Sequence, residues 1–283
     1  MASFPAGAVW LASYPKSGNT WMRVLLANLM AGGAAPVDIN ALPDDYAVTS
    51  RRQFAEHMLI DADLLTPDEL ERLRPAFNAA VFQPLEGPAF CKTHDPFFGR
   101  DGAGRARVPV LGTAARAAVY LIRDPRDVAI SFAHHMGADI DEAIRRMGDG
   151  SAVMGSAAQL SHHLGDWAGH VESWARQDLV PVAVIRYEDL RRDTHGCFAA
   201  LLNRLGVVAT AAEIDRAVAH SSLKALQGQE RLAGFRERLP GQGRFFRSGR
   251  VEGWRDVLST AQIRAIEDQC AATMIRWGYA LAG

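Results

Sequence analysis

Short apolar runs alternate with signals for helix starts along this chain, and that alternation restricts the folds it can adopt. The apolar runs have the length of buried strands, and helical patterns follow them. Strands and helices in alternation predict an α/β fold, with a central parallel sheet that is flanked by helices and binds ligands at the carboxyl ends of its strands. The expected strands cover residues 8–13, 89–93, 117–122 and 180–186.

Helix starts are marked by capping residues at several places. A helix is expected over residues 21–30, directly after the first strand. Two other starts have a proline at the first helical position, and three carry a glutamate or glutamine three residues after the capping residue. The capping residues are Thr66, Asp124, Thr210 and Ser259. The segments expected to be irregular cover residues 99–108, 137–165 and 228–253.

The composition indicates one globular domain over residues 1–283, since no repeat or long linker divides the chain. The net charge is −1 at pH 7, which argues against nucleic acid or a membrane surface as a partner. No basic leader or apolar run of 18 residues is present, so we expect a cytoplasmic protein. The sequence leaves the oligomeric state open, with a homodimer as one option. Reduced thiols are expected at Cys91, Cys197 and Cys270.

The first expected strand runs into a polar turn, SYPKSGNTW, at residues 13–21. A strand, a glycine-bearing turn and a helix in this order direct backbone N–H groups at one point, where the helix dipole adds positive potential. Lys16 adds a full charge, so the turn predicts a site for phosphate or sulfate. Its lysine precedes the glycine, unlike the ATP loop GxxxxGK, so a magnesium nucleoside triphosphate fits poorly.

A second anion site is predicted in YLIRDPRDVAIS, residues 120–131. Arg123 stands at a strand end, and Ser131 follows about two helical turns later. Lysine is otherwise rare, because 28 of the 31 basic residues are arginine. Lys16 and Lys92 therefore mark positions where a compact charge suits better than a guanidinium group.

These segments together resemble the cytosolic-type sulfotransferases, a family that includes small-molecule enzymes of bacteria. SYPKSGNTW is similar to the family's 5′-phosphosulfate loop, RDPRDVAIS to its 3′-phosphate motif, and CKTHDP to the strand end with its lysine and catalytic histidine. RYEDL at 186–190 and FFRSGRVEGW at 245–254 resemble its later nucleotide-binding segments. The resemblance runs from about residue 9 to about residue 275. It implies the P-loop NTPase-like sulfotransferase fold.

The resemblance implies a donor, 3′-phosphoadenosine 5′-phosphosulfate (PAPS), and no metal. Lys92 and His94 would flank the sulfuryl group and the acceptor hydroxyl. Trp21 would stack on the adenine, while Tyr187 and Ser221 would contact the adenosine. The 5′-phosphosulfate would be held by Lys16, Ser17, Gly18, Asn19 and Thr20, and the 3′-phosphate by Arg123, Ser131, Arg247, Ser248 and Gly249.

Sulfuryl transfer gives the expected catalytic residues physical roles. The sulfuryl group passes in line between two oxygens, so positioning and charge stabilisation supply most of the catalysis. His94 is the expected base, with an ordinary pKa of about 6.5. Lys16 and Lys92 suit the negative charge that grows on the bridging oxygen as the nucleotide leaves, so the reaction needs no metal.

Several positions depart from the family's pattern. Asn19 replaces a commoner threonine, and Leu223 stands where a phenylalanine often contacts adenine. Ser248 stands where lysine or arginine is frequent, so Arg244 or Arg250 is a candidate to replace that charge. The order Glu-Gly-Trp at 252–254 differs from the usual glycine-acid-tryptophan order and leaves the register of that segment open.

Two other functions are compatible with an anion-binding α/β chain. A P-loop kinase for nucleosides or other small molecules would need ATP and Mg²⁺, and the missing GKS or GKT sequence argues against it. A catalytically silent nucleotide-binding protein is the other alternative. Lys16 and the intact Lys-Thr-His sequence at 92–94 favour an enzyme over it.

The acceptor is a small hydroxylated molecule in this interpretation. Its pocket is expected from loops 32–62, 95–115 and 134–165, and a specialised metabolite is a plausible acceptor. The histidine pairs at 134–135 and 162–163 are expected to border this pocket, because adjacent histidines do not share a helix face for a metal. Five residues in these loops favour an apolar or aromatic alcohol: Phe97, Phe98, Met136, Met147 and Met154.

Overall fold

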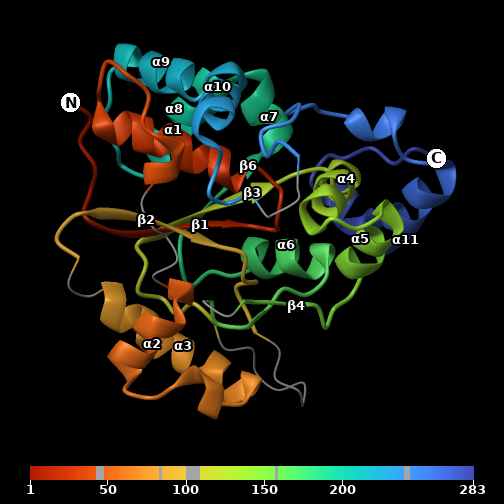
Figure 1. Cartoon of the computed structure of the whole chain (residues 1–283), viewed down its shortest axis with the longest axis horizontal. Coiled ribbons are helices and arrows are strands. Elements are labelled where there is room, and N and C mark those ends of the chain that lie inside the picture. The colour runs from red at the N-terminus through yellow and green to blue at the C-terminus, as the bar shows by residue number, and fades with distance from the viewer. Residues whose placement is uncertain (43–47, 83–84, 100–108, 157–158, 239–242) are drawn as a thin grey trace.

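The computed structural model describes residues 1–42, 48–82, 85–99, 109–156, 159–238 and 243–283 (Figure 1). Its centre is a parallel sheet with the strand order β2-β1-β3-β6, which confirms the expected α/β fold. The last strand begins two residues later than expected, at Val182, because Pro181 has no N–H to donate to a neighbouring strand. The strands are β1 (Gly7–Ser13), β2 (Pro88–Thr93), β3 (Ala117–Ile122) and β6 (Val182–Arg186).

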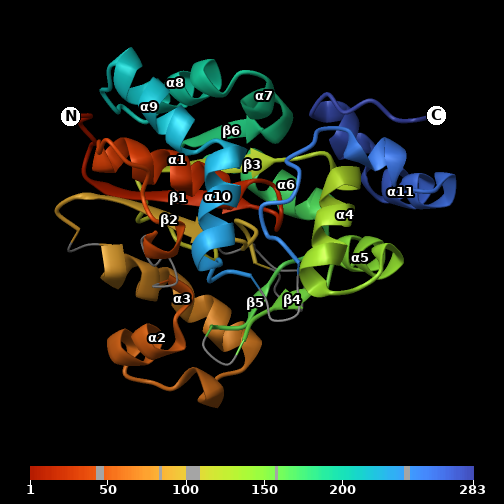
Figure 2. The same cartoon turned by 45° about the horizontal axis from the view of Figure 1, so that its top comes forward.

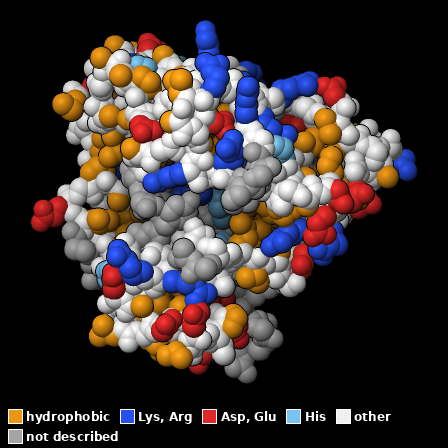
Figure 3. All heavy atoms as spheres, in the orientation of Figure 1, with side chains coloured by type: hydrophobic (Ala, Val, Ile, Leu, Met, Phe, Trp, Pro, Cys, Tyr) orange, Lys and Arg blue, Asp and Glu red, His pale blue; other side chains and the backbone are white. Residues whose placement is uncertain are grey.

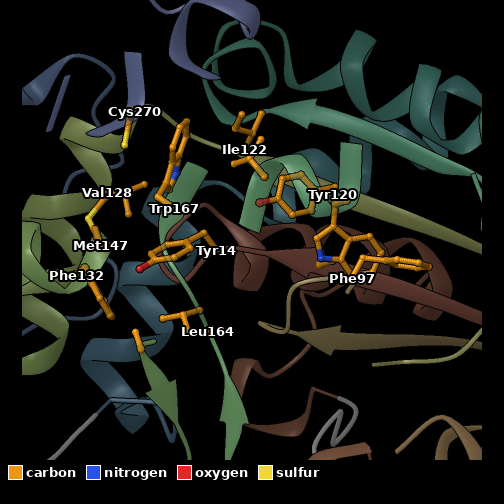
Figure 4. Close-up of a cluster of buried hydrophobic side chains, with 14 of the residues drawn as sticks. Tyr14, Phe97, Tyr120, Ile122, Val128, Phe132, Met147, Leu164, Trp167 and Cys270 are labelled. Carbon is orange, nitrogen blue, oxygen red and sulfur yellow. The ribbon is translucent and has the colours of Figure 1, made fainter. Parts of the chain in front are cut away.

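The two central strands are buried on both faces. Along β1, Trp10 and Ala12 belong to one apolar cluster, whereas Val9 and Leu11 belong to another. Because successive side chains point to opposite faces of a strand, these clusters lie on opposite sides of the sheet. Figure 4 shows part of the first cluster, in which Tyr120 of β3 lies near Phe97 and Ile122.

Helices cover both faces of the sheet (Figures 1 and 2). One side carries α1 (Asn19–Ala31), α7 (Tyr187–Arg192), α8 (Thr194–Arg204), α9 (Ala211–His220) and α10 (Leu223–Ala233). The other side carries α4 (Pro125–Met136), α5 (Ile140–Met147), α6 (Trp167–Ala175) and α11 (Thr260–Arg276). Beyond β2 lie α2 (Arg51–Met58) and α3 (Pro67–Phe82).

The expected helix starts agree with the structure. The reciprocal hydrogen bonds of a capping box are formed at Thr210 and Ser259. Thr66 and Glu69 exchange the same pair of bonds at the start of α3. Asp124 caps α4 by accepting from the N–H of Arg126. Local side-chain chemistry therefore fixes where these helices begin.

Two segments expected to be irregular contain regular structure. Residues 137–165 include α5 and the short antiparallel pair β4 (Val153–Met154) and β5 (His162–His163). Asp139 caps α5, and Ala143, Ile144 and Met147 are buried on one side of it. In 228–253, α10 continues to Ala233, and a short 3₁₀ helix, η4 (Gly253–Asp256), begins at the last residue. Most of the third segment, 100–108, lies outside the described residues.

Within the described ranges, we find no helix that combines the length and the apolar character needed to cross a bilayer.

Candidate active site

A pocket of about 690 Å³ opens at the carboxyl ends of the sheet strands. Figure 3 shows Lys and Arg side chains around the middle of this face, with histidine side chains between them. The volume is within the range of ordinary ligand sites. Most of the residues expected to act together line it: Lys16, Gly18, Asn19, Thr20, Trp21, Lys92, His94, Arg123, Ser131, Tyr187, Arg247, Ser248 and Gly249.

The turn between β1 and α1 is built to receive an anion. Lys16 has φ 69° and Gly18 has φ 102°, both in the left-handed region. Alternation of this kind turns successive N–H groups toward one concavity. Among the described residues no side chain caps the amino end of α1, and the buried hydroxyl of Ser17 has no hydrogen-bond partner. These unsatisfied donors fit a phosphate or sulfate group.

Gly18 and Asn19 shape this turn in different ways. A Cβ on Gly18 would come within 2.8 Å of the Tyr187 ring, so the close approach of α7 requires glycine as much as the positive φ does. The amide nitrogen of Asn19 donates to the Leu11 carbonyl at 2.8 Å and to the Ser13 hydroxyl at 3.2 Å. That side-chain nitrogen therefore braces the turn against β1.

Lys16 faces other cations in the pocket. Burial, together with the neighbouring charge of Lys92, lowers its pKa to about 7. Its ammonium lies 4.2 Å from the centre of the Phe245 ring, a cation–π contact. An anion bound here would relieve the repulsion and restore the full charge on Lys16.

His94 follows β2 and points its ring at the end of β1. Its Nδ1 lies 2.7 Å from the Ser13 carbonyl oxygen, which only accepts, so Nδ1 carries the proton and donates. Burial and the charge of Lys92 hold the pKa of His94 well below its usual value. The ring is consequently neutral, with Nε2 as its basic atom, and this is the tautomer that a general base requires.

Buried bonds on both sides of His94 hold the end of β2 in place. Asp95 forms a two-point ion pair with Arg74 of α3, with a 2.8 Å bond from Nη2. Trp174 Nε1 donates to the Asp95 carbonyl at 2.9 Å. His170 Nε2 donates to the His94 carbonyl at 3.1 Å. The catalytic candidate is thereby positioned by both α3 and α6.

The second anion site lies beside the first. Arg123 Nη1 donates to the Lys16 carbonyl at 3.2 Å, and Nη2 donates to the Arg250 carbonyl at 3.0 Å. Its guanidinium also lies 4.4 Å from the centre of the Tyr187 ring. Asp127 accepts from the Trp254 N–H at 2.9 Å, which ties the C-terminal part of the pocket wall to α4. The Arg123 side chain therefore joins the turn after β1 to the segment after α10.

The comparisons with known proteins agree with this geometry. The family model described as "Sulfotransferase domain" matches residues 7–278. The chain belongs to the sulfotransferase family. Membership confirms the expected enzyme class, a PAPS-dependent sulfotransferase, and the expected fold.

Individual relatives of this sulfotransferase are distant. Mouse Sulfotransferase 2B1 is 24% identical over 266 residues, covering 92% of this chain and 69% of its own. Cytosolic sulfotransferase 13 of Arabidopsis thaliana is 24% identical over 271 residues, covering 88% and 71%. The crystal structure of retinol dehydratase with androsterone and the inactive cofactor PAP has a TM-score of 0.59 at 21% identity, covering 94% of this chain and 80% of that one.

Two residues expected at the donor site are absent from the pocket lining of the sulfotransferase. The Ser17 and Ser221 side chains are buried. Ser221 accepts at its hydroxyl from the Asn28 amide at 3.1 Å and at its carbonyl from Trp21 Nε1 at 2.9 Å. Ser221 thereby fixes the Trp21 ring, which meets Tyr187 edge to face at 5.9 Å.

The acceptor side of the pocket differs from expectation. Of the five residues thought to favour an apolar acceptor, only Met154 lines the pocket, because Phe97 and Met147 are buried in the core and Phe98 and Met136 pack against it. From loop 95–115 the described residues contribute none of the lining. One histidine of each pair, His135 and His162, does line it. The other polar lining residues here are Thr49, Ser156 and Gln159.

Three charged residues near the site were not identified from the sequence: Arg23, Arg191 and Glu237. Arg191 of α7 lines the pocket, 5.4 Å from the centre of the Trp21 ring. It stands one helical turn after Tyr187, a spacing that could have identified it. Of the two arginines expected to replace a charge at position 248, Arg250 lines the pocket and Arg244 does not. Glu237 lines it and pairs with Arg23 at 2.5 Å and with Lys92 at 3.2 Å, and no motif in the sequence marks either Glu237 or Arg23.

Proposed function

We propose that this sulfotransferase moves the sulfuryl group of PAPS to a hydroxyl of a small-molecule acceptor, with His94 as the base. The observation that carries the proposal is the position of His94, whose Nδ1 lies 2.7 Å from the Ser13 carbonyl next to an uncapped, lysine-bearing turn. The base and the anion site thus share the carboxyl end of one strand pair, β1 and β2.

The transfer balances with the residues present. PAPS supplies the sulfuryl group, which leaves with breakage of its bond to the phosphate oxygen. The acceptor oxygen forms the new S–O bond, and its proton passes to His94 Nε2. The bridging oxygen keeps the electron pair and its negative charge, which Lys16 and Lys92 stabilise. Arg123, Ser131 and the segment 247–249 hold the 3′-phosphate in this scheme.

The polar residues on the acceptor side of the pocket favour an acceptor with polar groups over a plain apolar alcohol. His135, Gln159 and His162 offer hydrogen bonds along the acceptor side, and Met154 offers an apolar contact. We propose a specialised metabolite that carries further polar groups around the reacting hydroxyl. One relative, from Photinus pyralis, is named luciferin sulfotransferase, after a small molecule.

The cytoplasm is the compartment we propose. No disulfide joins Cys91, Cys197 and Cys270, all of which the structure describes, and this suits a reducing environment. One relative is named a cytosolic sulfotransferase.

Binding and transfer are tested together. Calorimetry with adenosine 3′,5′-bisphosphate (PAP) measures the donor site, and PAPS with a panel of hydroxylated metabolites is then followed by mass spectrometry for the gain of one SO₃ group. His94→Ala is expected to lower kcat by about 10²- to 10⁴-fold with PAP affinity kept. Absence of PAP binding by the wild-type protein would disprove the function, as would phosphate transfer from ATP and Mg²⁺ in place of sulfate transfer.

A further inference from the structure

Glu237 places a carboxylate inside the donor pocket. Oε2 lies 3.2 Å from Lys92 Nζ and 3.4 Å from the Thr20 hydroxyl, while Oε1 lies 2.5 Å from Arg23 Nη1. The Glu237 side chain is only 7% exposed. Two cations and a hydroxyl from α1 and β2 therefore converge on one internal anion.

Convergence of this kind is what an anion site provides for a ligand. Lys92 is assigned above to the sulfuryl group of the donor, and Thr20 to its 5′-phosphosulfate. A sulfuryl oxygen and the Glu237 carboxylate would need the same donors, and the two negative groups would repel each other at contact. A sulfuryl group that takes these donors would therefore require the Glu237 carboxylate to move away.

The backbone around Glu237 is anchored, but its carboxylate can leave. Phe235 packs against Phe245 and Phe246, with ring centres 4.7 and 5.1 Å away. The Arg236 N–H donates to the Asn40 side chain at 2.8 Å. Because these contacts hold the turn, rotation about the Glu237 side-chain bonds is sufficient to release Lys92 and Thr20.

We propose, on the basis of the function proposed above, that Glu237 is a built-in counter-anion of the sulfuryl-binding groups, which PAPS must displace and which therefore sets donor affinity. Lys92 and Arg23 hold the pKa of Glu237 down, to about 2, so the carboxylate stays charged at every working pH. It keeps Lys92 paired in the free enzyme. After transfer, the Glu237 carboxylate returns to Lys92 and thereby favours the enzyme state in which no sulfuryl group is bound.

The test compares PAPS with PAP, which lacks the sulfuryl group. By calorimetry, Glu237→Gln is expected to bind PAPS on the order of tenfold more tightly than the wild type, because the competing charge is gone. PAP affinity is expected to change by less than about threefold, because PAP has no group at the contested position. Glu142→Gln is the matched control: it also removes one negative charge, but Glu142 pairs with the exposed Arg145 outside the pocket lining.

The outcomes separate this inference from the function itself. Unchanged or weaker PAPS binding by Glu237→Gln overturns it, and so does equal tightening of PAPS and PAP, which would indicate a general charge effect. A crystal structure of the wild type with PAPS gives an answer that needs no variant: a Glu237 carboxylate still bonded to Lys92 beside the bound sulfuryl group overturns it. Failure of the proposed function would instead appear as a wild type that binds neither nucleotide.

Discussion

His94 has its charge and its tautomer set by separate contacts. Burial and Lys92 keep the ring neutral, and the bond to the Ser13 carbonyl decides which nitrogen carries the proton. A base of this kind is ready without any prior loss of a proton. The expected cost is a weaker proton affinity, because the same surroundings also oppose the imidazolium that forms during transfer.

The pH dependence of kcat/KM reports these settings in the free enzyme. His94 must be neutral to act, so activity is lost as pH falls through its pKa. Because that pKa lies well below 6.5, we expect no loss of kcat/KM from pH 7 down to below pH 6. A pH–rate profile measures this. An acidic limb centred at or above pH 6.5 would contradict the neutral, buried base.

Lys16 is expected to govern the alkaline side of donor binding. Its pKa of about 7 leaves a substantial fraction neutral above pH 7, yet the donor requires the ammonium form. PAP affinity is therefore expected to weaken as pH rises from 7 to 9, with uptake of about one proton on binding. Calorimetry in buffers of different ionisation heat measures that uptake. Lys16→Arg, which stays charged, is the control expected to bind without proton uptake.

At the scale of elements, α7 contributes two residues to the pocket lining, Tyr187 and Arg191. Tyr187 contacts the turn of β1, and Arg191 reaches the space between Trp21 and Gly249. A Cβ on Gly249 would lie 3.3 Å from the Tyr187 hydroxyl and 3.7 Å from the Arg191 guanidinium carbon. This helix therefore brings a cation next to Gly249, on a pocket wall that also contains Ser248.

Arg191→Ala is expected to weaken PAP binding on the order of tenfold, through loss of a charged contact to the 3′-phosphate side. Arg244→Ala is the comparison, because Arg244 is exposed and is not part of the pocket lining. Calorimetry at two salt concentrations measures both, and the Arg191 contribution is expected to shrink at the higher one. Equal effects of the two substitutions would rule out a specific role for Arg191.

The strand ends and helix starts could be predicted because each depends on residues that are close in the sequence. The strand ends at Ser13, Thr93 and Ile122 and the caps at Asp124 and Ser259 depend on neighbouring residues, so sequence patterns located them and the donor turn between them.

The acceptor wall depends instead on contacts between distant segments. Phe97 turns into the core against Trp174, with ring centres 5.1 Å apart, and Glu237 reaches Lys92 across 145 residues of sequence. The pattern of apolar residues alone gives no information on which of them face a pocket. For this reason four of the five apolar residues expected on the acceptor side do not line the pocket, whereas His94 does.

For the whole molecule, the Arg74–Asp95 ion pair joins the outlying α2–α3 unit to the sheet edge. Both side chains are buried, and the Thr93 hydroxyl also donates to Asp95, at 2.7 Å. Arg74 holds the pKa of Asp95 below its usual range, so this carboxylate stays ionised in the folded state. Its contribution to stability is present above the unfolded pKa of about 3.9 and is lost as pH falls toward the folded one.

Asp95→Asn is expected to lower the free energy of unfolding by about 3–5 kcal/mol, because it leaves the Arg74 charge buried without its counter-charge. Urea unfolding followed by circular dichroism measures the loss. Glu142→Gln removes an exposed carboxylate paired with Arg145 and is expected to have little effect. A loss as small as that of the exposed pair would show that the buried ion pair contributes little net stability.

The short β4–β5 hairpin and the end of α4 supply much of the proposed acceptor wall, whereas the proposed donor contacts come mainly from the ends of β1, β2 and β3, from α7 and from residues 247–249. In the proposed scheme, the two substrates are recognised by largely different segments of the chain. Replacing the β4–β5 hairpin with that of another sulfotransferase would give an engineered enzyme that keeps its affinity for PAPS and sulfates a different alcohol.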